Sequence, residues 1–390
     1  MRTSLVETPE AVVEVARSLA GCTSVPLDVE SNGLHAYKNA LCVLQLAAVR
    51  DGEIDEVFIV DTLRVGDAAL GALREVLGPG GPPKILHDLA FDVRILAAHG
   101  VLLGNVIDTS IAARFLGEKS TGLSSLAESK LGVKLSKELQ HHDWGRRPLT
   151  DDLQRYLVDD VAYLPSLAKA LFAEAEARDV VPEIEAETGY RLMTSIAAKD
   201  ETDPRPPYVR IKGIASLEPL ALACLRHLAD VREEAASRWD LPPFKVVGND
   251  VLIELAKKRP SDPSDVRKVK GLGGRATSLV PNLRRAIADG VREGDVPPEE
   301  RAAFFTEPPR QPRFEIEARR AREQRLSAWR RRVAKERAVD EQVVLPGHCV
   351  QEIVDRVPDD LGDLASIAGL GARRLERDGA AILAALHGTV

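Results

Sequence analysis

The feature of this sequence that most constrains its fold is an internal duplication in its second half. A shift of 98 residues, without a gap, aligns Arg232 with Arg330 and Gly271-Leu272-Gly273 with residues 369–371. Identities at glycine, proline and charged positions in one register seldom arise by chance. We therefore predict two copies of a helical domain of about 75–80 residues, a period too long for a solenoid. The other identical pairs are Leu228 and Leu326, Ala236 and Ala334, Glu254 and Glu352, Pro260 and Pro358, Asp262 and Asp360, Asp265 and Asp363, and Arg275 and Arg373.

Two stretches that are rich in proline and charge separate these copies from each other and from the first half of the chain. They are residues 199–213 and 292–314, which lack apolar periodicity and are typical of linkers. A chain of 390 residues is too long for one ordinary core. The linkers predict three domains, at residues 1–198, 214–291 and 315–390.

The first of these blocks alternates short apolar runs with turn residues and then changes to strand–helix units. This order predicts a mixed α/β sheet with helices on its faces. The first three expected strands, a meander, are residues 27–30, 41–49 and 57–60. The later expected strands are 84–86 and 106–107, and the expected helices are 91–99, 110–116, 125–131 and 151–176.

The net charge of −7 is distributed unevenly along the chain. Residues 1–200 hold 20 Lys and Arg against 30 Asp and Glu, whereas residues 201–390 hold 33 against 30. An acidic half joined to a mildly basic half suits a metal site that is served by a separate polyanion-binding region, although uneven surface charge without a function is an alternative. The most basic stretch, residues 310–337, has eleven Lys and Arg against four Asp and Glu. We interpret it as a surface that follows the phosphates of a polyanion, in preference to a solvated helix face.

Several classes of protein are disfavoured by what the sequence lacks. It has no apolar run of about 18 residues and no signal-peptide pattern, so we expect a cytoplasmic protein without membrane contact. A helicase is excluded, because no GxxxxGK[ST] loop is present. We expect buried thiols in a reducing compartment and no zinc site, because the cysteines form no CxxC pair. These cysteines are Cys22, Cys42, Cys224 and Cys349.

Acidic residues and one tyrosine form a candidate site in the first block. Asp28 and Glu30 are two apart on an expected strand, so both side chains point to one face among apolar neighbours. Such a pair is costly unless a cation neutralises it, and oxygen ligands suit magnesium or manganese. Asp92 is expected near the start of a helix, and Tyr156 and Asp160 are expected on one helix face at i, i+4. Taken singly, each residue also has an ordinary structural explanation, such as a solvated strand edge or a favourable charge at a helix start.

Together these residues resemble the DEDDy superfamily of 3′→5′ exonucleases, in which Asp-x-Glu, a later Asp and Tyr-x-x-x-Asp converge on two metal ions. Segments 27–46, 84–96 and 152–167 are similar to the three motifs of the ribonuclease D family. Residues 122–150 carry Leu-Gly-Val, and an Asp-Trp pair followed by Arg-Pro-Leu-Thr, as that family does. The two repeats are similar to HRDC domains, which ribonuclease D carries in tandem.

The resemblance implies a ribonuclease H-like α/β exonuclease domain followed by two all-α HRDC domains. It implies a 3′→5′ exoribonuclease that uses two divalent ions, Mg²⁺ or Mn²⁺, and releases 5′-nucleoside monophosphates. Asp28, Glu30 and Asp160 would hold one ion, Asp28 would bridge to the second, and Asp92 would hold that ion through water. Tyr156 would orient the attacking water. The expected partner is RNA with a free 3′ end, tRNA precursors being the family's main substrate.

Further residues are candidates for nucleic-acid contact. Upstream of the third motif these are Lys137, Trp144, Arg146 and Arg147, and in the second repeat Arg330, Arg331 and Arg332. For Trp144 and the two upstream arginines, packing between helices and simple solvation are equally good alternatives. The two Gly-Leu-Gly turns could bind phosphate through their amides, but a plain helix connection is the preferred interpretation.

Four questions about substrate, activity and assembly are not decided by the sequence. Several bacterial relatives have phenylalanine after the Glu of the first motif, whereas Ser31 occupies that position here, so the nucleotide preference is open. A DNA exonuclease of the same superfamily would differ only in its contacts to a 2′-hydroxyl. A non-catalytic RNA-binding scaffold is disfavoured because all four acids and the tyrosine are present together. Whether the two repeats dimerise the chain or extend its grip on RNA is also open.

Overall fold

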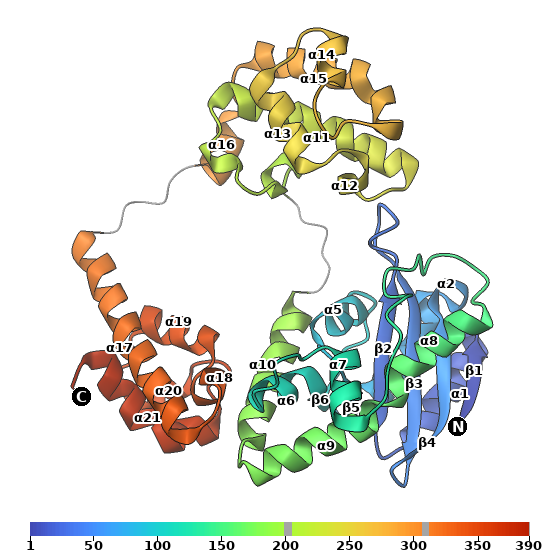
Figure 1. Cartoon of the computed structure of the whole chain (residues 1–390), viewed down its shortest axis with the longest axis vertical. Helices are drawn as coiled ribbons and strands as arrows, with labels where there is room; N and C mark the ends of the chain where they lie inside the picture. The colour runs from blue at the N-terminus through green and yellow to red at the C-terminus, as the bar shows by residue number, and fades with distance from the viewer. Residues whose placement is uncertain (199–204, 306–311, 390) are drawn as a thin grey trace. The chain divides into compact units, whose positions relative to one another are not determined.

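The computed structural model describes residues 1–198, 205–305 and 312–389 (Figure 1). These residues form two compact units. The first unit contains residues 1–30, 41–198 and 312–389, and the second contains residues 31–40 and 205–305. Each unit is described separately below. Among the described residues, no helix is both long enough and apolar enough to cross a membrane.

The first unit is built on a six-stranded mixed sheet with the order β1-β4-β3-β2-β5-β6. Strands β3 and β4 are antiparallel, whereas β1 runs parallel to β4, and β5 runs parallel to both β2 and β6. The mixed sheet and the sequential neighbours β2, β3 and β4 confirm the prediction from sequence. Strand β1 was not predicted, because only the last of its five residues is buried. The strands are β1 (Arg2–Val6), β2 (Val25–Ser31), β3 (Leu41–Arg50), β4 (Glu53–Asp61), β5 (Lys84–Leu86) and β6 (Val106–Asp108).

Helices cover this sheet and complete one apolar core. The helix predicted over residues 151–176 is in fact two helices that meet at Tyr163. Pro165 explains the break, because it has no amide hydrogen to donate to the carbonyl of Val161. The helices of the exonuclease part are α1 (Pro9–Ala20), α2 (Thr62–Val65), α3 (Asp67–Leu70), η1 (Gly71–Leu73), α4 (Arg74–Leu77), α5 (Ala90–Ala98), α6 (Thr109–Phe115), α7 (Leu123–Leu126), η2 (Ala127–Leu131), α8 (Asp151–Ala162), α9 (Leu164–Ala177) and α10 (Val181–Ala197).

The two repeats have the same succession of helices, displaced by 98 residues. Their first helices end at Asp240 and Ala338, and their third helices end before Arg259 and Val357, all four in the left-handed conformation. The first repeat consists of α11 (Pro219–Trp239), α12 (Pro243–Val246), α13 (Asn249–Lys258), α14 (Pro263–Arg267), η5 (Gly274–Leu279) and α15 (Val280–Glu293). The second repeat consists of α17 (Arg313–Arg337), α18 (Glu341–Val344), α19 (Gly347–Arg356), α20 (Leu361–Ala365) and α21 (Ala372–His387).

Parts of the expected linkers fold onto the first repeat. Tyr208, in η3 (Pro207–Arg210), is fully buried, and its hydroxyl donates to Glu300 at 2.7 Å. Its ring stacks on Phe305, just after α16 (Pro298–Phe304). These two aromatic side chains outweigh the proline-rich composition, because each adds a large apolar surface to the core. A short turn, η4 (Ile214–Ser216), precedes α11. Residues 199–204 and 306–311 of the expected linkers lie outside the described residues.

The second repeat packs against α10 through buried charged side chains. The Arg374 guanidinium is fully buried and donates to the carbonyls of Val343 at 2.9 Å and Leu370 at 3.0 Å. Arg377 forms a 2.8 Å ion pair with Glu183 of α10, which is also fully buried. One turn further along α10, Glu187 pairs with the His348 ring at 3.0 Å, and Tyr190 stacks on that ring at 3.7 Å. Each buried charge in this interface therefore has a partner.

Candidate active site

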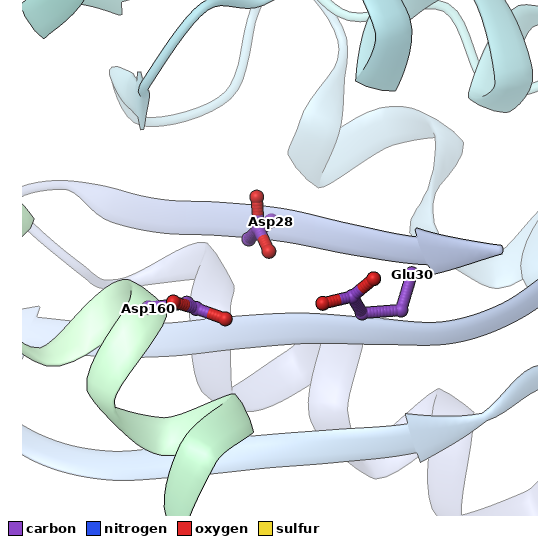
Figure 2. Close-up of side chains that lie close together, drawn as sticks. All are labelled: Asp28, Glu30 and Asp160. Atoms are coloured by element: carbon purple, nitrogen blue, oxygen red, sulfur yellow. The ribbon is translucent and has the colours of Figure 1, made fainter. Parts of the chain in front are cut away.

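Three carboxylates converge where β2 passes α8. Asp28 and Glu30 lie two apart on β2 and point to one face, as their spacing predicts, and Asp160 reaches the same place from α8 (Figure 2). One oxygen of each lies within 4.8 Å of the others. Asp159, which is adjacent in sequence, is turned away and lines a hollow beside Met1 and Thr3. The strand and helix periodicities thus select which acids meet.

The pKa values of all three acids are raised, by burial first and, for Glu30 and Asp160, also by neighbouring acids. Burial raises the pKa of Asp28 to about 7. Burial and the charges of Asp28 and Asp160 raise the pKa of Glu30 to about 9. Burial and the charges of Asp28 and Asp159 raise the pKa of Asp160 to about 8. Such a cluster of oxygen ligands fits a divalent cation, because a cation would remove the repulsion and let the acids ionise near neutral pH.

Asp92, the fourth predicted acid, is carried by α5. It lies in the first turn of α5 and only 5% of it is exposed. Burial raises its pKa well above the ordinary value, and Asp28, Asp108 and Glu30 raise it further. Asp92 is outside the group of three within 4.8 Å, but it belongs to the same electrostatic cluster. The structure thus brings three of the four expected acids together, and the charges of Asp28 and Glu30 act on the fourth.

Tyr156 lies one helical turn before Asp160 on the same face of α8. Burial, followed by the charges of Asp160, Glu30 and Asp28, raises its pKa above the ordinary value of 10. The phenol therefore keeps its proton at neutral pH and can donate a hydrogen bond. A cavity of about 190 Å³ opens beside Tyr156 and Asp160, and it is also lined by Lys137, Gln140 and Ser124. This cavity gives room for a substrate group next to the acids.

Trp144 is buried, and Arg147 is partly buried and engaged by other groups of the protein. Trp144 is 1% exposed, and its ring lies 5.8 Å from the ring of Tyr156. Arg147 forms two hydrogen bonds to the fully buried Asp61, one of them 2.7 Å long, and another to the carbonyl of Cys42 at 2.9 Å. The packing alternative therefore describes both residues better than a nucleic-acid contact. Asp61 had not been singled out from sequence, and its only signal is a polar residue at the end of an apolar strand.

The other expected nucleic-acid contacts differ in exposure. Lys137 is exposed at the cavity beside Tyr156, and the Arg146 side chain is 79% exposed with a partner in Asp143. In α17, the Arg330 side chain is only 12% exposed and donates to the carbonyl of Glu341 at 2.9 Å, so it belongs to the repeat's own structure. The side chains of Arg331 and Arg332 are 73% and 55% exposed.

Much of the remaining positive charge of α17 is also used inside the second repeat. Arg319 pairs with Asp355, and Arg337 pairs with Asp378. Arg325 donates to main-chain carbonyls near the end of α21. The excess of basic residues in this segment is therefore a poor measure of the charge that an RNA would meet there.

Asp108 is a positioning residue that sequence reasoning missed. It is fully buried at the end of β6, caps α6 by accepting from the amide of Ile111 at 2.8 Å, and accepts from the amide of Leu89 at 2.7 Å. It thus ties the start of α5, which carries Asp92, to the sheet. An aspartate directly before a helix is a capping signal that could have identified it. His87 has a packing role: burial lowers its pKa to about 4, and its Nδ1 lies 2.8 Å from the Thr109 hydroxyl.

Comparisons with known proteins agree with this site and with the repeats. The family model of the 3′-5′ exonuclease domain matches residues 3–176, and that of the HRDC domain matches residues 221–278 and 319–386. The chain is 30% identical to ribonuclease D of Escherichia coli over 276 residues, which are 70% of this chain and 71% of the relative. It is 27% identical to ribonuclease D of Desulfotalea psychrophila over 265 residues, which are 67% and 69% of the two chains.

Two solved structures share the fold over almost the whole chain. The crystal structure of Escherichia coli RNase D matches with a TM-score of 0.67 at 22% identity and covers 100% of this chain and 99% of its own. A protein from Bifidobacterium adolescentis matches with a TM-score of 0.74 at 21% identity and covers 99% and 97%. With the sequence matches above, these findings show that the chain belongs to the ribonuclease D family of hydrolytic 3′→5′ exoribonucleases.

Proposed function

We propose that Asp28, Glu30, Asp92 and Asp160 hold two divalent cations, Mg²⁺ or Mn²⁺, where the 3′-terminal nucleotide of an RNA is hydrolysed to a 5′-monophosphate. The observation that carries this proposal is the convergence of three partly buried acids from β2 and α8, near the buried Asp92 of α5. Burial and the charges of neighbouring acids raise the pKa values of Glu30 and Asp92. When bound, such cations neutralise the acids, lower the pKa of an attacking water and stabilise the leaving 3′-oxygen.

The chain's own residues supply orientation. Tyr156 remains protonated, so its hydroxyl can hold the attacking water in place but cannot serve as its base at neutral pH. Lys137, exposed at the adjoining cavity, is suited to pair with a substrate phosphate. Arg146 offers a second exposed cation in the same stretch. Asp108 fixes the start of α5 and thereby the position of Asp92.

The proposed substrates are structured RNAs with short single-stranded 3′ tails, tRNA precursors among them. The related Escherichia coli enzyme is described as an exoribonuclease involved in structured RNA processing. We propose that residues 1–198 carry the chemistry and that residues 214–291 and 315–390 are the two HRDC domains. Such an arrangement lets a compact RNA be held while its tail is trimmed.

The test is cleavage of matched single-stranded RNA and DNA oligonucleotides with Mg²⁺, with Mn²⁺ and with a chelator. We expect stepwise shortening of the RNA from its 3′ end, release of 5′-monophosphates, and no reaction with the chelator. Cleavage that persists with the chelator would contradict the metal assignment. Faster cleavage of the DNA than of the RNA would contradict the substrate class.

A further inference from the structure

The Gly-Leu-Gly turn has different surroundings in the two repeats. In the second repeat it is packed against α10: a Cβ on Gly371 would lie 2.8 Å from the Cβ of Ala186, and one on Gly369 would lie 2.9 Å from the ring of Tyr190. In the first repeat Gly271 and Gly273 are exposed, and nothing lies within 4 Å of a Cβ on Gly273. One copy of the turn is therefore a protein contact, and the other faces solvent within its own unit.

The sequence around the turn is also more basic in the first repeat than in the second. Residues 262–285 of the first repeat contain six Lys and Arg and two Asp, whereas the matching residues 360–383 contain three Arg and four Asp and Glu. Five basic positions of the first repeat are uncharged in the second. These pairs are Arg267 and Ala365, Lys268 and Ser366, Lys270 and Ala368, Arg284 and Ile382, and Arg285 and Leu383.

The arginines that remain around the second turn are all used within the protein. Arg373 pairs with Asp179 at 2.6 Å, and Arg377 pairs with Glu183. Arg374 is fully buried among main-chain carbonyls. The second turn therefore presents little free positive charge to a polyanion.

The cations around the first turn are free to meet a ligand. Arg267, Lys270 and Arg284 are exposed, and within the described chain no ion pair or hydrogen bond engages their side chains. Helices α14 and α15 pack together, and the charge of Arg284 on α15 acts on Asp262, the residue that caps the start of α14. Hydrogen bonds from Ser264, with the nearby charges of Lys268 and Arg284, hold the pKa of Asp262 below its ordinary value.

An aromatic side chain borders the same surface. The Arg275 guanidinium lies 4.4 Å above the ring centroid of Trp239, the last residue of α11, and this ring is partly exposed. Stacked arginine and tryptophan planes are a common platform for nucleic-acid bases. The position matching Trp239 in the second repeat is Arg337, which pairs with Asp378. The aromatic element is thus confined to the first repeat as well.

We infer that this surface of the first repeat binds the phosphate backbone of the RNA substrate. The matching surface of the second repeat packs against α10 and does not bind RNA. We call the surface of the first repeat the first-repeat basic face, and its residues are Arg267, Lys270, Arg275 and Arg284. The inference rests on the proposed function, because RNA is the polyanion in question. The two repeats, residues 214–291 and 315–390, hold 13 Lys and Arg each, so the count does not distinguish them. The inference places RNA binding on the first repeat because exposed and unpaired charge is what phosphates meet.

The experiment compares two triple variants of the full-length chain. The test variant is R267A/K270A/R284A. The control, R238A/K245A/K257A, removes three exposed cations elsewhere on the same repeat, so both variants lose the same net charge. Affinity for a tRNA-sized RNA with a single-stranded 3′ tail is measured across a salt series in the presence of a chelator, which prevents cleavage. Thermal unfolding of each variant checks that the fold is kept.

We expect the test variant to flatten the plot of log affinity against log salt by about 2, since each lost phosphate contact accounts for roughly 0.7. The control should keep the wild-type slope. Equal slopes for the wild type and the test variant, or equal flattening by both variants, would overturn the inference. A loss seen instead in R331A/R332A would also overturn it and would place the RNA on α17.

Cleavage of a short single-stranded RNA separates this inference from the proposed function. The short RNA should be cut at the wild-type rate by the test variant in Mn²⁺, because it reaches only the acids and the adjoining cavity. If the wild type does not cut it at all, the proposed function fails, whatever the salt slopes are. If the wild type cuts it, but the wild type and the test variant have the same slope of log affinity against log salt, only the assignment of RNA binding to the first-repeat basic face is wrong.

Discussion

The first unit buries charged side chains, wholly or in part, in two regions. The pKa values of the acids are shifted in opposite directions in these two regions. Between α10 and the second repeat, burial alone would raise the pKa of Glu187 and Asp378, but their cationic partners outweigh it and leave both values below the ordinary range. At the site on β2 and α8, the neighbours of Glu30 are other acids, and its pKa rises to about 9. Paired buried charge stabilises a fold, whereas unpaired buried charge of one sign indicates a position for a missing cation.

The largest expected effect is that of removing one acid of the site. Asp28→Asn should lower RNA hydrolysis by at least on the order of a thousandfold, because it deletes the ligand that the resemblance assigns to both cations. The metal-free variant should be as stable as the wild type or more so, since a repulsive charge is lost. Turnover and thermal unfolding, measured together, check both statements. Wild-type turnover in Mg²⁺ or Mn²⁺ would remove Asp28 from the chemistry.

In the contact between α10 and the second repeat, removing a buried charged side chain should lower the stability of the fold. Arg374→Ala should destabilise the first unit by about 3–5 kcal/mol, because it leaves the buried carbonyls of Val343 and Leu370 without their charged donor. The matched control is Arg373→Ala, whose ion pair with Asp179 is exposed to solvent and should contribute little to stability. Urea unfolding of both variants provides the comparison. If both variants lost the same free energy of unfolding, the buried contacts of Arg374 would not be what stabilises this interface.

Tyr156→Phe sharpens the assignment within the site. It keeps the ring against Trp144 and removes only the hydroxyl, so thermal stability should stay close to that of the wild type. We expect kcat to fall on the order of 10- to 100-fold through loss of water positioning, with a much smaller change in KM. Single-turnover kinetics on a short RNA would show this. An unchanged kcat would make Tyr156 a packing residue.

The smallest expected effect concerns pH. The folded pKa of Glu30 is about 9, above its unfolded value, so the metal-free fold favours the protonated form. Its stability is therefore greatest below the unfolded pKa and declines as pH rises toward 9. Glu30→Gln removes this decline, so in a chelator it should raise the unfolding temperature at pH 8 and leave it nearly unchanged at pH 4. A pH-independent difference would mean that repulsion at Glu30 is not the cause.

Local periodicity was enough to predict much of the site. Two-residue spacing on a strand placed Asp28 and Glu30 on one face, and four-residue spacing on a helix did the same for Tyr156 and Asp160. The meeting of the strand with the helix came from the family resemblance, because no local pattern encodes a contact between distant segments. The duplication likewise predicted two copies of one helical fold, since identical turn and capping residues require the same backbone.

What the sequence could not provide are the partners of charged side chains. Arg147 finds Asp61 across 86 residues, and Arg377 of the second repeat finds Glu183 of α10. Both pairs depend on tertiary packing, which composition does not report. Counting basic residues therefore favoured α17 as an RNA surface, although several of its arginines are consumed by neighbouring groups. The aromatic residues Tyr208 and Phe305 were hidden in the same way by the prolines around them.

The most direct test of the central claim is to measure the binding of Mn²⁺ to the full-length protein by titration calorimetry in the absence of RNA. The account predicts that the wild type binds Mn²⁺, that Asp28→Asn and Asp160→Asn lose most of this binding, and that Asp159→Asn keeps it, because Asp159 points away from the cluster. Binding that is equal in all four proteins, or absent from a wild type that still cleaves RNA, would contradict the assignment of these acids as the metal site.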